Sequence, residues 1–122
     1  MLLEVRKNPQ IYVQHNAMDA QYLAPATSNF RINLGLIAEV SLYSIKEVTT
    51  KKSLDGRDLE LPINTRVIHL EMSYTHSTHE AGRGTSNTYT VNERYFYKLV
   101  FLPEAEDEYL RIRGTLDRQT LA

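Results

Sequence analysis

The sequence predicts an α+β fold that is mostly β, in which an antiparallel sheet has one C-terminal helix packed on it. Apolar and polar residues alternate along residues 66–75 and again along 88–102, which is the period of a half-buried strand. Apolar residues then recur at helical spacing near the C-terminus. A chain of 122 residues suits one domain, so we expect a single domain over 1–122, β-rich over 1–102, with the helix at about 103–119.

The N-terminal part is expected to hold short strands and turns. Residues 2–6 and 10–14 have the composition of two strands on either side of Asn8-Pro9, a pair typical of turns. Residues 16–29 contain a proline and a small polar run, so we expect them to be irregular. Alternation then resumes at Phe30 and stops at a glycine after Leu34.

A long strand is predicted over residues 37–50, with an irregularity inside it. Val40 and Leu42 share one parity, whereas Tyr43 and Ile45 share the other. A change of parity within one strand is typical of a β-bulge or a strong bend. We therefore expect this strand to bend near Tyr43.

A hairpin is expected at Asp55-Gly56, because glycine accepts the positive φ of a tight turn. Its flanks carry Lys51, Lys52 and Arg57. Such polar flanks predict an exposed hairpin tip.

Residues 66–75 and 88–102 are expected to pair with each other. The second strand has two chemically different faces. One face carries Tyr89, Val91, Tyr95, Tyr97, Leu99 and Phe101, and the other carries Asn92, Arg94, Phe96, Lys98 and Val100.

The helix is predicted from its opening and from its apolar stripe. Pro103 stands at the first turn, and acidic residues follow it near the positive end of the helix dipole. The stripe consists of Ala105, Tyr109, Ile112 and Leu116. Arg111 falls nearly opposite Tyr109 and is expected to be solvated. Arg113 lies only about 40° from Tyr109, so it must pair with an acid, reach solvent or face a ligand.

Composition excludes several classes of protein. Fourteen basic against fifteen acidic residues give a net charge of −1, which argues against a binder of duplex nucleic acid. The absence of cysteine excludes disulfides, thiolate metal sites and cysteine nucleophiles. The sequence shows no signal peptide and no segment long enough to span a membrane, so we expect a cytoplasmic protein without a membrane partner.

Metal binding and catalysis have only weak sequence signals. His76, His79 and Glu80, with His69 as a possible third histidine, could ligate a metal, but their spacing fixes no rigid tetrahedron. No serine stands in a nucleophile elbow, and no phosphate or dinucleotide fingerprint is present. We therefore expect no metal, no cofactor and no catalytic residue. A small enzyme with one of the histidines as its acid or base stays open as an alternative.

The candidate ligand-binding residues are cations with polar and aromatic neighbours. One strand face could stack a base and hold a phosphate, although a solvated sheet face has the same pattern. Its members are Asn92, Arg94, Phe96 and Lys98. The loop around Arg83 could form an anion site or a simple hairpin tip. The full set is Arg113, Arg94, Asn92, Phe96, Arg57 and Arg83. These separate cations favour a compact anionic ligand over a long polymer.

Two segments resemble a known family. The runs FRINLGLIAEVSLYSIKEV (30–48) and YFYKLVFLPEAEDEYLRIRGTLD (95–117) resemble small phage proteins with a sheet-then-helix plan, and among these the phage anti-Thoeris sponge family, which sequesters cyclic ADP-ribose signals. The resemblance is one of length, element order and an arginine-bearing helix, and covers roughly the last ninety residues. It implies a non-catalytic homo-oligomer that encloses a small cyclic nucleotide and so blocks host anti-phage defence.

The residues also allow a second function. A protein-interaction module, such as an inhibitor, an immunity protein or a phage assembly subunit, needs only the eight tyrosines and an exposed sheet edge. The sponge hypothesis instead requires Arg57, Arg94 and Arg113 to converge in one cleft.

Overall fold

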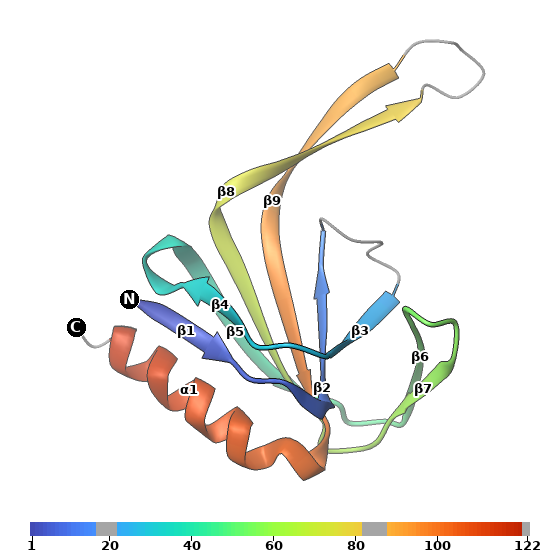
Figure 1. Cartoon of the computed structure of the whole chain (residues 1–122), viewed down its shortest axis with the longest axis vertical. Coiled ribbons are helices and arrows are strands. Elements are labelled where there is room, and N and C mark those ends of the chain that lie inside the picture. The colour runs from blue at the N-terminus through green and yellow to red at the C-terminus, as the bar shows by residue number, and fades with distance from the viewer. Residues whose placement is uncertain (17–21, 82–87, 121–122) are drawn as a thin grey trace.

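The fold is that of a computed structural model, which describes residues 1–16, 22–81 and 88–120. It confirms the predicted class, a mostly β chain with a large sheet and one C-terminal helix (Figure 1). The elements are β1 (Leu2–Val5), β2 (Asn8–His15), β3 (Tyr22–Ala26), β4 (Phe30–Asn33), η1 (Leu34–Leu36), β5 (Ile37–Ser44), β6 (Thr49–Ser53), β7 (Asp58–Leu61), β8 (Arg66–Ala81), β9 (Thr88–Phe101), η2 (Pro103–Ala105) and α1 (Glu106–Thr120).

Seven strands form the large sheet in the order β5-β8-β9-β2-β3-β6-β7. All neighbours are antiparallel except β3 and β6, which pair in parallel through Tyr22 with Lys52 and Leu23 with Ser53. The strands β1 and β4 form a separate antiparallel pair. None of the helices in the described part of the chain is long and apolar enough to cross a membrane.

One side of the large sheet, here called the helix face, packs against α1 and the β1–β4 pair (Figure 1). The sheet contributes residues such as Leu70, Leu99 and Phe101, and the helix contributes the predicted stripe with Ile112 at its centre. Phe101 and Ile112 are fully buried. This layer is the main core and buries most of the apolar side chains.

The opposite side, here called the open face, has a second and smaller core. Its buried members are Leu23, Leu61, Val67 and Val100. The β6–β7 hairpin supplies Leu61 and turns at Gly56, whose φ is 87°, as the Asp55-Gly56 pair predicts. Both faces of the sheet therefore carry apolar side chains near its base.

The β8–β9 hairpin continues beyond the other strands as an arm, defined here as residues 75–81 with 88–94 (Figure 1). At its base, Glu71 pairs with Phe96 and Thr75 pairs with Arg94. Between these two pairs β8 advances by four residues, whereas β9 advances by only two, so β8 contains two extra residues. An even number of extra residues preserves the alternation of faces.

Asn16 marks the place where β2 ends beside β9. Its side-chain nitrogen donates to the Arg94 carbonyl at 3.0 Å, and its side-chain oxygen accepts from the Phe96 amide at 3.2 Å. The last backbone pair between these strands is His15 with Tyr97. A primary amide can replace a peptide group of a strand because it both donates and accepts hydrogen bonds, so Asn16 continues the pairing of β9 by its side chain.

Several expected elements are corrected. The predicted strand over 37–50 is two strands, β5 and β6, and the bulge in β5 lies between Ile37 and Glu39. Pairing between β5 and β8 is regular through Tyr43, so the strand does not bend there. The apolar residues change parity because the open face has a second core, against which Ile45 packs. The Asn8-Pro9 pair begins β2 instead of forming a turn, and the expected irregular segment 16–29 contains β3.

Arg111 is only partly exposed, contrary to the expectation from the helical wheel that it is solvated. Its guanidinium donates to the Glu4 carbonyl of β1 at 2.7 Å and to the Glu108 carboxylate at 2.6 Å. Arg6 donates to the other Glu108 oxygen at 3.2 Å. The hydrogen bond from Arg111 lowers the pKa of Glu108, so this carboxylate stays ionised and ties α1 to β1.

Candidate ligand-binding pocket

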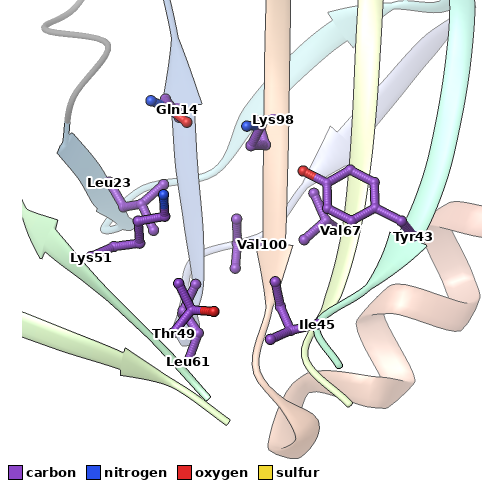
Figure 2. A pocket seen from close by; sticks show the side chains of 10 residues that line it. All are labelled: Gln14, Leu23, Tyr43, Ile45, Thr49, Lys51, Leu61, Val67, Lys98 and Val100. Atoms are coloured by element: carbon purple, nitrogen blue, oxygen red, sulfur yellow. The ribbon is translucent and has the colours of Figure 1, made fainter. Parts of the chain in front are cut away.

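The open face carries a cavity of about 390 Å³ between β5 and the β6–β7 hairpin. This volume lies within the range of known small-molecule sites, which are usually concave and mostly apolar. Its walls are formed by Gln14, Leu23, Tyr43, Ile45, Thr49, Lys51, Leu61, Val67, Lys98 and Val100 (Figure 2).

The floor of this pocket is the small core of the open face. Leu23, Leu61, Val67 and Val100 are each at most 4% exposed. They come from four strands, and alternation along each strand turns these side chains towards the open face. Figure 2 shows Val100 at the centre of the floor, with Ile45 below it. An apolar part of a ligand would lie against this surface.

Two lysines stand at the rim of the pocket. Lys51 comes from β6 and Lys98 from β9, with β2 and β3 between them in the sheet. Figure 2 shows them on either side of β2. Neither ammonium forms an ion pair with any residue in the described part of the chain, whereas neighbouring Lys52 pairs with Asp58 at 2.5 Å. The pocket therefore offers two positive charges that no described carboxylate neutralises.

Tyr43 closes the side of the pocket formed by β5. Figure 2 shows its hydroxyl directed towards the centre. Burial raises the pKa of Tyr43, and the nearby Lys51 opposes this effect. The phenol therefore stays protonated at neutral pH and can donate a hydrogen bond to a ligand. Gln14 and Thr49 add polar groups to the same rim.

A row of side chains continues from the pocket along β8 and β9. Lys98 pairs with His69, and next to them the rings of His69 and Phe96 lie 5.2 Å apart. Burial and the charge of Lys98 lower the pKa of His69, against the opposing charges of Glu71 and Glu39. His69 is therefore held in its neutral form beside the pocket.

Three of the predicted site residues lie in this row, because alternate residues of β9 point to the same face. Phe96 stands next to Lys98 on the open face, followed by Arg94 and Asn92. The Arg94 guanidinium lies 3.9 Å from the Glu71 carboxylate, and Asn92 is hydrogen-bonded to Ser77 at 2.5 Å. None of the three lines the pocket itself.

The other predicted site residues lie elsewhere. Arg57 is exposed in the β6–β7 turn, 3.5 Å from Asp55, and lines a separate cavity of about 140 Å³. Arg113 is exposed on α1, 3.9 Å from Asp117, and its guanidinium donates to the Tyr109 hydroxyl at 3.4 Å. Arg83 lies outside the described residues. The pocket thus contains neither Arg57, Arg94 nor Arg113, and each of these arginines has an acidic neighbour. The convergence of these three arginines in one cleft, which the sponge hypothesis requires, is therefore not found.

The histidines considered as metal ligands are not brought together. His69 lies on the open face, whereas His76 lies on the helix face, 5.9 Å from the Tyr95 ring. The side chain of His79 lies outside the described residues. Within the part of the chain that the structure describes, no three potential ligands among His, Asp and Glu are grouped to hold a metal ion.

Sequence reasoning missed Lys51, Tyr43 and Gln14 as pocket residues. The charges of Lys51 and Lys52 predict an exposed hairpin tip for both residues. The alternation of a strand could have identified Lys51. Adjacent residues point to opposite sides of a strand, so one of the two lysines must face the pocket.

Comparison with known proteins adds no family to this geometry. No family model, no curated protein and no solved structure matches this chain. The resemblance to the anti-Thoeris sponge family therefore stays a prediction. The chemistry of the pocket is an apolar floor under two unneutralised lysines and a protonated tyrosine.

Proposed function

We propose that this chain is a non-catalytic binding protein that holds a small anionic ligand of the cyclic nucleotide class in the pocket of the open face. The observation that carries the proposal is the pair Lys51 and Lys98 above an apolar floor, without described acidic partners. Cations placed over apolar surface are suited to a compact molecule that has both phosphate and carbon surface.

The parts of such a ligand correspond to the parts of the pocket. Each lysine can meet a phosphate as a point charge with three donors. The Tyr43 hydroxyl and the Gln14 amide can bind ribose or phosphate oxygens. The floor around Val100 can take the apolar face of a base or sugar. The row of His69 and Phe96 extends aromatic surface beyond the rim.

The biological role in this proposal is sequestration of a cyclic ADP-ribose type signal, which would block host anti-phage defence. The sequence resemblance suggests this ligand. The three arginines expected to hold its phosphates do not converge, so Lys51 and Lys98 take that role in the proposal. Sequestration requires tight binding and no bond cleavage, so the lysines need only hold the ligand.

Thermal unfolding in the presence of cyclic ADP-ribose isomers and of cyclic di- and trinucleotides tests the proposal. Free ligand at about a hundredfold its Kd would stabilise the folded state by about 2.7 kcal/mol. We expect one nucleotide to raise Tm by several degrees and to be recovered intact after heating. No shift with any of them would contradict the proposal and favour the protein-interaction module. A ligand recovered in altered form would contradict binding without turnover.

Adjacent lysines provide a matched control. Lys51→Gln and Lys98→Gln should each weaken binding by about tenfold or more, because a hydrogen bond to a charged group contributes roughly 1.5–3 kcal/mol. Lys52→Gln removes the same charge from the same strand, but Lys52 pairs with Asp58 outside the pocket. It should leave Kd nearly unchanged in isothermal titration calorimetry. Equal losses in all three variants would indicate a general effect of net charge instead.

A further inference from the structure

The strand β5 is one edge of the large sheet, and the described part of the chain places no strand beside its outer side. Exposed strand edges present unpaired backbone groups and are usually protected by lysine, proline, bulges or covering segments. The only charged residue of β5 is Glu39, and its only bulge lies at its beginning, between Ile37 and Glu39. From Val40 to Ser44 the edge is regular, uncharged and unprotected.

Large apolar side chains are exposed along this same edge. Leu42 is 41% exposed on the helix face, and Tyr43 is 45% exposed on the open face. Leu36, just before the strand, is also exposed. An edge with these properties on both faces is suited to pairing with another strand.

We propose that β5 pairs with β5 of a second copy of this chain, antiparallel and centred on Ser41. The proposal is independent of the ligand that the pocket binds. Two copies related by a twofold axis perpendicular to the sheet keep their helix faces on the same side. Directly opposite residues must then share a face, which permits only registers centred on a residue.

The side chains favour the register centred on Ser41 over the register centred on Leu42. It places Val40 opposite Leu42 of the second copy on the helix face, and Glu39 opposite Tyr43 on the open face. The two Glu39 residues stand four strand positions apart, about 13 Å, so their repulsion is largely screened. Centring on Leu42 would instead place Glu39 opposite Ile45.

A groove on the helix face supports the same occupant. It has a volume of about 360 Å³ and lies between the start of β5 and the end of α1, with Ile37, Val40 and Leu116 among its lining residues. In the proposed register, Leu42 of the second copy lies directly opposite Val40, at the mouth of this groove. The exposed apolar side chain and the apolar groove are thus complementary between two identical chains.

Molar mass in solution tests the pairing. Light scattering after gel filtration should give twice the 14.1 kDa of one chain for the wild type. Ser41→Lys and Ser41→Glu should each be monomeric, because each places like charges opposite each other at the centre of the pair. An equimolar mixture of the two variants should recover the dimer. Thr50→Lys, an exposed position on β6, should remain dimeric.

A single cysteine tests the register, since the natural chain has none. Opposite residues of an antiparallel pair have Cα atoms about 4.5–5.5 Å apart, which a disulfide can span. Ser41→Cys should therefore form a covalent dimer on mild oxidation, and Thr50→Cys should not. A monomeric wild type, a dimer that survives Ser41→Lys, or equal cross-linking of both cysteine variants would each overturn the proposal.

Discussion

Two arginines on α1 show how much depends on the surroundings of a single residue. Arg111 and Arg113 differ little in sequence context. The Arg111 side chain is 28% exposed and bridges Glu108 and the Glu4 carbonyl, whereas Arg113 is 45% exposed beside Asp117. The helical wheel predicts the reverse, because it contains only α1 and not β1, which lies along the side of the helix that holds Arg111.

Substitution of these two residues should therefore have different effects. Arg111→Ala should lower the free energy of unfolding by about 1–3 kcal/mol, because Glu108 and the Glu4 carbonyl lose a charged donor. Arg113→Ala should change it by no more than about 0.5 kcal/mol, as exposed pairs contribute little. Urea denaturation measures both values. Similar losses in the two variants would mean that Arg111 does not fasten the helix to β1.

At the scale of elements, the stability of the β8–β9 hairpin depends on the strands that pair with its two outer edges. The base of β8 lies between β5 and β9, and the base of β9 lies between β8 and β2. Asn16 extends the support of β9 as far as Arg94. An isolated two-stranded ribbon is marginally stable in water, so Asn16 stands at the boundary between the supported base and the arm.

Asn16→Ala should lower the free energy of unfolding by about 1–3 kcal/mol, because Asn16 is only 9% exposed and its loss removes both hydrogen bonds. Hydrogen exchange at the Phe96 amide should also become faster. Asn29→Ala is the matched control, since exposed Asn29 accepts one bond from the Lys7 amide at 2.7 Å. A smaller effect of Asn16→Ala than of Asn29→Ala would contradict the role of Asn16 as a substitute strand.

The sequence predicted the elements with strong local periods and failed where pairing is distant. The alternation of 66–75 and 88–102 and the stripe ending at Leu116 predict the existence and type of β8, β9 and α1 correctly, but β8 continues beyond the predicted end at residue 75 to Ala81. Nothing local indicates that β1 pairs with β4 or that β3 pairs in parallel with β6. The pocket depends on that second pairing, because it places the β6–β7 hairpin and Lys51 at the edge of the open face. Its position could therefore not be predicted from periodicity.

At the scale of the whole molecule, two histidines should make global stability depend on pH. Burial lowers the pKa of His15, with a further contribution from His76, and burial with Lys98 lowers that of His69. The unfolded chain then binds more protons near their usual pKa. The free energy of unfolding should fall from about pH 7.5 to about pH 5.5, by at most about 1.4 kcal/mol per pH unit for each histidine.

Urea denaturation across this range measures the slope, above the pH at which carboxylates such as Glu108 take up protons. His15→Gln and His69→Gln should each reduce the slope, and the double variant should be nearly independent of pH. In His15→Gln the neighbouring Tyr95 hydroxyl, now 3.0 Å from the His15 Nδ1, can still find an acceptor. A slope that persists in the double variant would assign the effect to other groups.

The irregular base of the arm resembles an in-frame insertion in a gene. Side chains alternate between the two faces of a strand with a period of two residues. The two extra residues between Glu71 and Thr75 preserve this alternation, so Tyr74 and His76 remain beside Tyr95. Removing one residue there would act as a frameshift, because the side chains of the arm would change sides or the pairing with β9 would have to move. Chain length at this point should therefore vary among functional versions of the protein in even steps.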